Sequence, residues 1–417
     1  MLGREERAGI AAFIIVVGFW IGVAYYYRNG YYFNLPYPRN TFLAMPSDVG
    51  NDFFHLFDAV KAGSPYSWIW SLYFPFSYIP IYPLTVFSRQ TAYAIFCLVF
   101  LGFASHLAYR YLAFLPKYQR WLAAFIIVFA SYPVVFILER GNFEMMIFVY
   151  IYLFLHFYQR GKLGWSAFFL ACAAAMKLYP AVLGVLFLRR SVFRRQFKYG
   201  LLSAVFAVLL TCGSAALYPG GIGGTYRTIS GKMDAFKDNY VVGDEGLPYT
   251  CSYFGLVKTV MLMRHPKYHA KPLGSLPPAK EELARILPYY NVIALCIFAV
   301  IAVCIIWRER LFWQQVAVLI CTMLLLPTVT VDYKLILLLF PLMLFIATEE
   351  RTRFDWLYLI LLVSLLIPKS YIWIRYNVAT TIIWNPLLMT ALVVTILLER
   401  QRAATPAPVP VPSLPVR

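Results

Sequence analysis

The sequence predicts an all-α polytopic membrane protein, with about twelve transmembrane helices and short interfacial helices in its first outer loop. Of its 417 residues, 61% are hydrophobic and 13% are charged, whereas ordinary soluble domains are about 45–50% apolar and about 25% charged. The apolar runs are also long and continuous, as helices that cross about 30 Å of hydrocarbon require. The short alternating segments that are typical of a membrane β-barrel are missing.

The apolar runs give the approximate positions of the spans. The first run, 8–27, is too long for the core of a signal peptide and lacks a clear cleavage site, so we expect a retained first span. The predicted spans lie near residues 8–27, 91–110, 121–138, 143–158, 163–178, 180–189, 199–217, 288–307, 311–327, 333–348, 354–367 and 378–398.

Basic residues orient the predicted spans. The short inner segments hold 18 Lys and Arg residues, and the outer segments, apart from the long loop 218–287, hold eight. Because cytoplasmic loops collect Lys and Arg, we expect a multi-pass protein of the plasma membrane with both termini in the cytoplasm. The net charge of +18 has the same explanation, so nucleic acid is not an expected partner.

Cysteine and histidine give no sign of a metal site or a disulfide framework. The seven cysteines contain no C-x-x-C pair, and no H-E-x-x-H or Cys/His cluster occurs. His106 and His156 stand alone on apolar helices, which favours a packing role. We therefore expect neither a metal nor another cofactor.

Residues 1–402 are predicted to form a single membrane domain, followed by a disordered Pro-rich tail at 403–417. In the first outer loop, 28–90, Pro75, Pro80 and Pro83 would each break a helix and so exclude an ordinary span, and two short interfacial helices fit better. The second, 218–287, is Gly-rich and polar, which predicts a mobile loop or lid.

The fifth and sixth spans are short. Each of the two legs between Lys162 and Arg189 has about 13 residues, or about 20 Å. A broken helical pair is therefore expected, with Lys177-Leu178-Tyr179-Pro180 at its tip. Discontinuous helices of this kind usually line a binding site.

Asp52 is the first candidate for chemistry. It follows the first span on the predicted outer side, on a short helix whose Phe53, Leu56 and Phe57 share one face that would lie in the membrane surface. Asp52 would then point toward a cavity, where a carboxylate can act as general base. A helix cap or a solvated acid explains it equally simply, and Asp48 is a rival base.

Further polar residues are predicted on the same outer side. Lys177 could meet a phosphate or a carboxylate, or it could reach the interface by snorkelling. In the turn after the third span, Arg140 could bind a phosphate and Asn142 a sugar or a pyrophosphate-like oxygen, although an ordinary polar hairpin is also possible. Asp332 and Lys334 open the tenth span, where they could contact a lipid-linked phosphate or simply pair with each other.

An ordered set of motifs resembles a known family, glycosyltransferase family 87. These motifs are Asp52-Phe53 with Phe57 and Ala59, Gly63-Ser64-Pro65-Tyr66, Tyr82-Pro83-Leu84, the Gly141-Asn142 turn, and Lys177-Leu178-Tyr179-Pro180 followed by a basic inner loop. The family comprises polytopic mannosyltransferases that depend on polyprenyl-phosphate mannose and belong to the C-type membrane glycosyltransferases. The resemblance extends from about residue 48 to about residue 200.

The resemblance implies a reaction at the outer membrane face. A hexose, mannose in this family, would pass from a polyprenyl-phosphate carrier to the hydroxyl of a lipid or glycan acceptor with inversion. Asp52 would deprotonate that hydroxyl, while Arg140, Lys177 and Lys334 would stabilise the departing phosphate. The partners would be this donor, the acceptor and membrane lipids. The alternative is a transporter or flippase of a lipid-linked sugar, which inverted repeats would favour.

Overall fold

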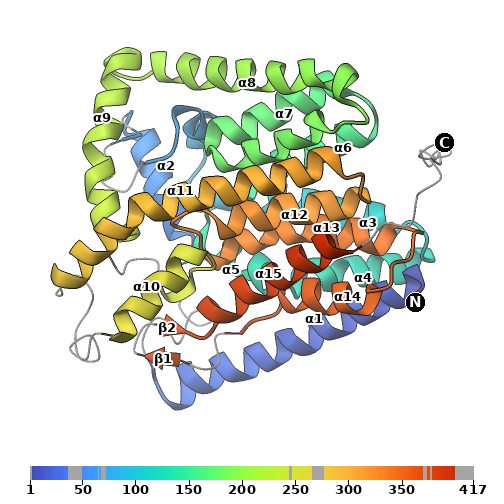
Figure 1. Cartoon of the computed structure of the whole chain (residues 1–417). Helices are drawn as coiled ribbons and strands as arrows, with labels where there is room; N and C mark the ends of the chain where they lie inside the picture. Colours follow the sequence, from blue (N-terminus) through green and yellow to red (C-terminus); the bar gives the residue numbers. More distant parts are fainter. Residues whose placement is uncertain are drawn as a thin grey trace.

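The long apolar runs fold into helices that lie side by side (Figure 1). The computed structural model describes residues 2–35, 49–63, 65–66, 72–243, 247–264, 277–369, 373–375 and 378–399. The α-helices of this part of the chain are α1 (Arg4–Tyr27), α2 (Asn51–Lys61), α3 (Arg89–Tyr111), α4 (Lys117–Phe129), α5 (Tyr132–Arg140), α6 (Glu144–Gln159), α7 (Leu163–Met176), α8 (Phe193–Ala216), α9 (Gly221–Phe236), α10 (Tyr253–Arg264), α11 (Pro277–Trp307), α12 (Phe312–Leu325), α13 (Leu339–Ala347), α14 (Asp355–Ser364) and α15 (Thr381–Leu398).

Shorter elements complete the described fold. The 3₁₀ helices are Pro75–Val86, Tyr179–Leu188, Leu247–Tyr249 and Asp332–Leu338, and the π-helical turns are Arg28–Tyr32 and Lys237–Val241. The antiparallel strands β1 (Trp373–Arg375) and β2 (Val378–Ala379) pair Trp373 with Ala379 and Arg375 with Val378. The all-α class is therefore confirmed, with one small hairpin added.

Several helices are long and apolar enough to cross a membrane. Five pass this test among the described residues, and α4 with α5 forms a sixth if the bent pair is one span. The five are Arg4–Tyr32, Arg89–Tyr111, Phe193–Ala216, Ala279–Trp307 and Thr381–Leu398. Shorter apolar helices, such as α7 and α12, lie within other predicted spans. A multi-pass architecture is thus supported, while the count of twelve stays a prediction.

The core lies around α12 and α13. Every residue of α12 from Trp313 to Leu325 is buried, as is every residue of α13 from Leu339 to Ile346. By contrast, only 17% of the apolar window of α8 and 11% of that of α11 are buried. A helix that is hydrophobic all round must lie inside protein or against lipid. The arrangement therefore places α12 and α13 inside the bundle and exposes apolar faces of α8 and α11 at its periphery.

The chain is broken at two places in the predicted spans, once within a span and once between two short spans. The run 121–138 forms α4 and α5, which meet at a bend of 55°. Pro133, in the first turn of α5, cannot donate a backbone hydrogen bond, which favours a new helix start there. The predicted break between the fifth and sixth spans is confirmed, because α7 ends at Met176 and the 3₁₀ helix begins at Tyr179.

The two loops that were predicted to face outward both contain helices. The first contains two helical segments, α2 and Pro75–Val86, as predicted, although their position at a membrane interface is not tested. The second contains α9, α10 and the start of α11, so it is largely helical, and its predicted role as a mobile loop or lid stays a prediction. Gly220 caps α9 at φ +83°, and Pro277 opens α11. Both residues begin helices here, although Gly and Pro are commonly taken as loop signals.

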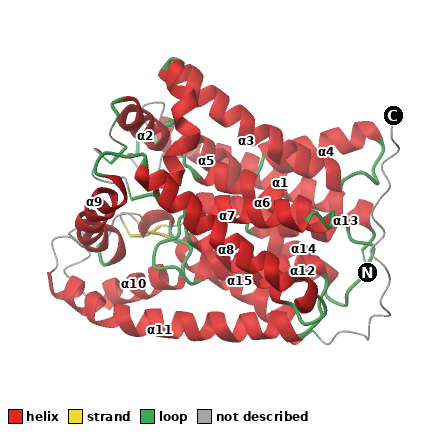
Figure 2. Ribbon diagram, turned by 90° about the horizontal axis from the view of Figure 1, so that it is seen from above, coloured by secondary structure: helices red, strands yellow, loops and turns green. Residues whose placement is uncertain are grey.

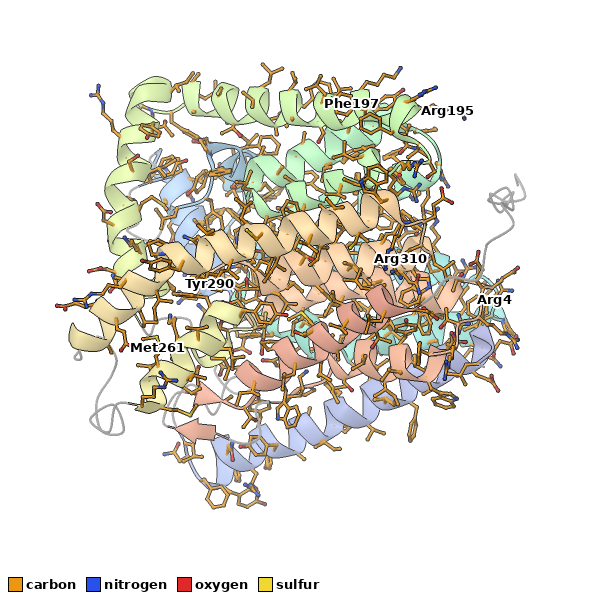
Figure 3. The ribbon with its side chains drawn as sticks, in the orientation of Figure 1. Arg4, Arg195, Phe197, Met261, Tyr290 and Arg310 are labelled. Carbon is orange, nitrogen blue, oxygen red and sulfur yellow. The ribbon has the colours of Figure 1, made fainter. Side chains whose placement is uncertain are left out.

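The helices give the molecule two distinct ends. α2 and α9 lie at one end, and the start of α1 lies at the opposite end, in two perpendicular views (Figures 1 and 2). Arg4, Arg195 and Arg310, which belong to three of the predicted inner segments, gather at the end where α1 starts (Figure 3). This grouping agrees with the predicted threading, in which those segments share one side.

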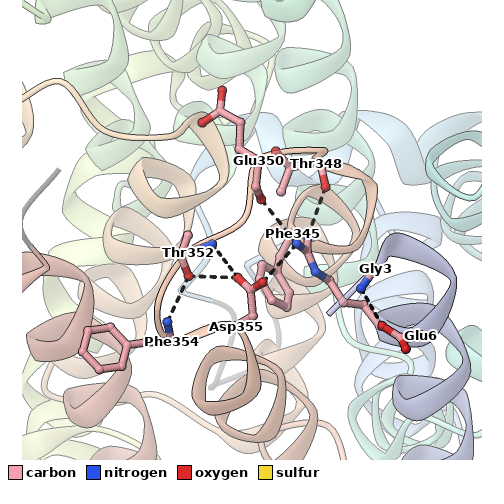
Figure 4. A network of polar contacts seen from close by, with 9 residues as sticks. Gly3, Glu6, Phe345, Thr348, Glu350, Thr352, Phe354 and Asp355 are labelled. Atoms are coloured by element: carbon pink, nitrogen blue, oxygen red, sulfur yellow. Dashed lines mark hydrogen bonds and ion pairs between the residues drawn. The ribbon is translucent and has the colours of Figure 1, made fainter. Parts of the chain in front are cut away.

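A buried ion pair fastens α1 at that end. The Arg7 guanidinium lies 3.3 Å from Asp355 Oδ2, and each side chain is 1% exposed. Arg7 also donates to the carbonyls of Phe345 and Thr348 at 2.8 and 3.0 Å. Asp355 accepts hydrogen bonds from the backbone and hydroxyl of Thr352, both at 2.9 Å (Figure 4). The network ties the first helix to the turn between α13 and α14.

Candidate functional site

The first wall of the site is the start of α2. Gly50 precedes the helix with φ +74°, and its backbone N–H donates to the Glu139 carbonyl at 2.6 Å. Asp52 follows in the first turn with its side chain 18% exposed. Negative charge in the first turn of a helix is favoured by the helix dipole. The hydrogen bond from Gly50 to Glu139 holds the start of α2 against the end of α5. Asp48, the rival base, lies outside the described residues.

The apolar face of α2 packs against protein. Phe53, Leu56 and Phe57 are each at most 1% exposed, and the Phe53 ring lies 5.1 Å from that of Phe96 in α3. The expectation that this face lies in the membrane surface is therefore wrong. The spacing of apolar residues is the same for a helix on lipid and for a helix docked on a core, so the sequence could not separate the two.

The turn between α5 and α6 brings two predicted residues to Asp52. Arg140 Nη2 lies 2.7 Å from Asp52 Oδ1, and Asn142 Nδ2 donates to Asp52 Oδ2 at 2.8 Å. Between them, Gly141 has φ +66°, a left-handed conformation that glycine adopts without steric cost. The carboxylate is thus held at both oxygens by a cation and an amide.

Glu144 is the centre of a second group. It opens α6, is 0% exposed, and its backbone N–H donates to Asn142 Oδ1 at 3.1 Å. Lys177 Nζ lies 2.6 Å from Glu144 Oε1, and Lys334 Nζ lies 3.8 Å from the same oxygen. The Tyr179 hydroxyl donates to Glu144 Oε2. The predicted cations Lys177 and Lys334 therefore meet at one buried carboxylate.

The break after α7 places Lys177 in this group. Lys177 has an extended backbone, with φ −149° and ψ 141°, which turns the chain out of α7. The Ser77 hydroxyl donates to the Met176 carbonyl at 3.0 Å, which satisfies one of the backbone carbonyls at the end of α7. The Lys177 ammonium lies 4.7 Å from the centre of the Tyr73 ring, and that of Lys334 lies 4.8 Å from the Tyr179 ring.

Asn142 joins the two groups. Besides Asp52, its amide nitrogen lies 3.3 Å from the hydroxyls of Tyr73 and Tyr333. Burial, with the charges of Asp52 and Glu144 nearby, raises the pKa of Tyr73. Tyr73 therefore stays protonated at neutral pH and can serve as a hydrogen-bond donor or acceptor there.

Asp332 lies apart from these groups. It is 0% exposed, and its Oδ1 accepts a hydrogen bond from Asn385 of α15 at 2.8 Å. Lys334, two residues later, pairs with Glu144, so the simple pairing of Asp332 with Lys334 does not form. The structure thus brings together Asp52, Arg140, Asn142, Lys177 and Lys334, and it leaves Asp332 in a buried contact with α15.

The sequence motifs did not predict Glu144 as a site residue. The signal was present, because it is the only acid in the apolar sequence of α6. An ionisable residue inside an apolar span marks a functional site by default. Within the described residues, no group of three or more His, Cys, Asp or Glu side chains gathers as metal ligands do.

Comparison with protein families identifies the chain. The model of glycosyltransferase family 87 matches residues 71–341. The chain belongs to glycosyltransferase family 87. This membership makes it a membrane glycosyltransferase, and the resemblance seen in the sequence motifs is confirmed. The matched region of this family 87 enzyme contains Arg140, Asn142, Lys177 and Lys334 but begins after Asp52. No curated protein and no solved structure matches the chain.

Proposed function

We propose that this family 87 glycosyltransferase moves mannose from a polyprenyl-phosphate carrier to a hydroxyl of a lipid or glycan acceptor. The reaction takes place at the outer face of the plasma membrane, with both termini in the cytoplasm. The observation that carries the proposal is the adjacency of a partly exposed carboxylate, Asp52, to a group that contains two lysines. A base and a cationic phosphate site are the two parts that this transfer requires.

In the proposed step, Asp52 accepts the proton of the acceptor hydroxyl. The acceptor oxygen forms a bond to the anomeric carbon of the sugar from the side opposite the phosphate. The bond between the anomeric carbon and the phosphate oxygen breaks, and its electron pair stays on the phosphate. One displacement of this kind inverts the anomeric configuration. The lysine ammoniums stabilise the charge that develops on the leaving phosphate.

The contacts support a division of labour among the site residues. Arg140 and Asn142 each bind one oxygen of Asp52, so they orient the base as well as facing the substrate. Arg140 is also a proposed contact to a phosphate or sugar oxygen, since a guanidinium binds such oxygens with several N–H donors. Lys177 and Lys334, with side chains 22% and 10% exposed, are the proposed phosphate contacts. Asp332 is a less favoured substrate contact, because it is fully buried.

Transfer of radiolabelled mannose tests the proposal. Membranes that carry the wild type, Asp52→Asn or Asp58→Asn are supplied with polyprenyl-phosphate mannose. Asp58 is a matched control, since it lies on the same helix with its side chain 54% exposed and pairs with Arg89 at 3.4 Å. Asp52→Asn is expected to lower turnover by about 10²–10⁴-fold while donor binding is retained, because general base catalysis contributes that much.

Each outcome of this assay has a distinct meaning. Wild-type turnover in Asp52→Asn removes Asp52 as the base. Equal losses in both variants point to damage to α2 rather than to lost catalysis. If the wild type transfers another hexose from the same carrier but not mannose, the sugar assignment fails and the reaction type stands.

A further inference from the structure

The group around Glu144 has an unbalanced charge. One carboxylate faces two ammoniums, with Lys177 Nζ at 2.6 Å and Lys334 Nζ at 3.8 Å from the same oxygen, Oε1. The three side chains together carry one net positive charge at neutral pH. Because Glu144 is 0% exposed and the lysines are mostly buried, solvent screens these charges only weakly. The group therefore attracts an anion.

Glu144 itself is not placed to contact a substrate. Both of its carboxylate oxygens are engaged, Oε1 with the lysines and Oε2 with the Tyr179 hydroxyl. Its backbone N–H is bound by Asn142 Oδ1, so the start of α6 is fixed as well. Any effect of Glu144 on the reaction therefore passes through Lys177 and Lys334.

The reaction changes the charge that this group faces. The sugar donor is a phosphodiester with one negative charge, whereas the leaving polyprenyl phosphate is a monoester with a charge of about −1.5 to −2 at pH 7. A cationic site binds the more highly charged product more tightly than the donor. A site that holds its product too tightly limits the rate of turnover by slow release.

We propose that Glu144 is a positioning residue that competes with the lipid phosphate for Lys177 and Lys334 and so speeds release of the polyprenyl phosphate product. The proposal rests on the function proposed above. While phosphate is bound, the two ammoniums divide their hydrogen bonds between the phosphate and Glu144. When the product leaves, Glu144 again neutralises one of them. The Tyr73 and Tyr179 rings, 4.7 and 4.8 Å from the two ammoniums, keep the lysines in place throughout.

The test uses binding of geranylgeranyl phosphate and of geranylgeraniol, its neutral counterpart, to the purified full-length protein in detergent. Glu144→Gln keeps the shape of the side chain and an acceptor for Lys177, and it raises the net charge of the group by one. The variant is expected to bind the phosphate about tenfold more tightly or more, which is about 1.4 kcal/mol. Binding of the alcohol stays unchanged, and kcat and KM for the donor fall together.

A double variant provides the matched control. Glu144→Gln combined with Lys334→Gln returns the group to one net positive charge and leaves Lys177 in its hydrogen bond. The affinity for geranylgeranyl phosphate is expected to return to within about threefold of the wild type, or about 0.65 kcal/mol. Lys334→Gln alone, with no net charge, is expected to bind the phosphate more weakly than the wild type.

Other results overturn the proposal. Unchanged or weaker phosphate binding in Glu144→Gln does so, and parallel weakening for the phosphate and the alcohol marks a merely structural role. If Glu144→Gln does not fold, the double variant compared with Lys334→Gln alone decides, since loss of the Glu144 charge in that background is expected to tighten phosphate binding, and unchanged or weaker binding contradicts the charge argument. A wild type that binds neither geranylgeranyl phosphate nor a polyprenyl-phosphate sugar removes the proposed function, which is a separate result seen before any variant is made.

Discussion

Replacing Gly141 by alanine tests how the turn between α5 and α6 presents the site. A Cβ at this position would lie 2.9 Å from Phe53 Cβ, 3.0 Å from Gly50 Cα and 3.1 Å from Tyr93 Cε2. Gly50 Cα is a backbone atom and cannot rotate away. The residue also has φ +66°, which costs an L-residue about 1–2 kcal/mol. The overpacking adds about 1–3 kcal/mol.

Gly161 is a matched control for the backbone cost. It has φ +70°, and no atom lies within 4 Å of the position where its Cβ would be. Gly161→Ala is therefore expected to lower the free energy of unfolding by about 1–2 kcal/mol. Gly141→Ala is expected to lower it by the same backbone cost and, in addition, by about 1–3 kcal/mol for overpacking. The stability difference is measured by thermal or denaturant unfolding of the two purified variants in the same detergent.

Activity separates the two glycines more sharply. Arg140 and Asn142 flank Gly141 and hold Asp52, so a shift of the turn by about 1 Å is expected to lower kcat by roughly 10²-fold. Gly161→Ala is expected to keep wild-type transfer, because its turn lies between α6 and α7, away from the site residues. Equal stability and equal transfer in the two variants would refute the reasoning from the close approach at Gly141.

Three further substitutions, one of them a control, test the packing of the fold. Asp355→Asn leaves the Arg7 charge buried without its partner and is expected to destabilise the protein by about 3–5 kcal/mol. Glu349→Gln, which breaks the exposed Arg4 pair at 2.9 Å, is expected to cost less than about 1 kcal/mol, and similar unfolding midpoints for both variants would contradict this. Phe53→Ala empties a fully buried ring position of α2 and is expected to cost about 3–5 kcal/mol. A loss below about 1 kcal/mol would instead fit a helix that lies on lipid.

The sequence grouped most residues of the candidate site because the predicted threading places them on one side of the membrane. The direction predicted for each span from its basic flanks gave Asp52, Arg140, Lys177 and Lys334 this common side. The break at Lys177 followed from the length of the two legs, since neither could cross the hydrocarbon alone. Residues that are distant in the chain could thus be grouped without any knowledge of packing.

Other features depend on contacts that local patterns do not encode. The pairing of Lys334 with Glu144, and of Asp332 with Asn385, is decided by how α6, α15 and the 3₁₀ helix Asp332–Leu338 pack together. Likewise, the Gly-rich and polar composition of 218–287 suggested a loop, whereas α9 and α10 form there. Tertiary contacts routinely override weak local propensity in this way.

The site is assembled from parts of the chain that are made at very different times. The proposed base lies in α2, the two groups that bind it lie at the α5–α6 turn, and the two lysines lie just after α7 and near the start of the 3₁₀ helix Asp332–Leu338. During synthesis from the N-terminus, Asp52 and Arg140 are made long before Lys334. A chain that ends before Lys334 therefore lacks one of the two cations beside Glu144. The candidate site is complete only after most of the chain has been synthesised, so a partly synthesised copy does not carry the whole site.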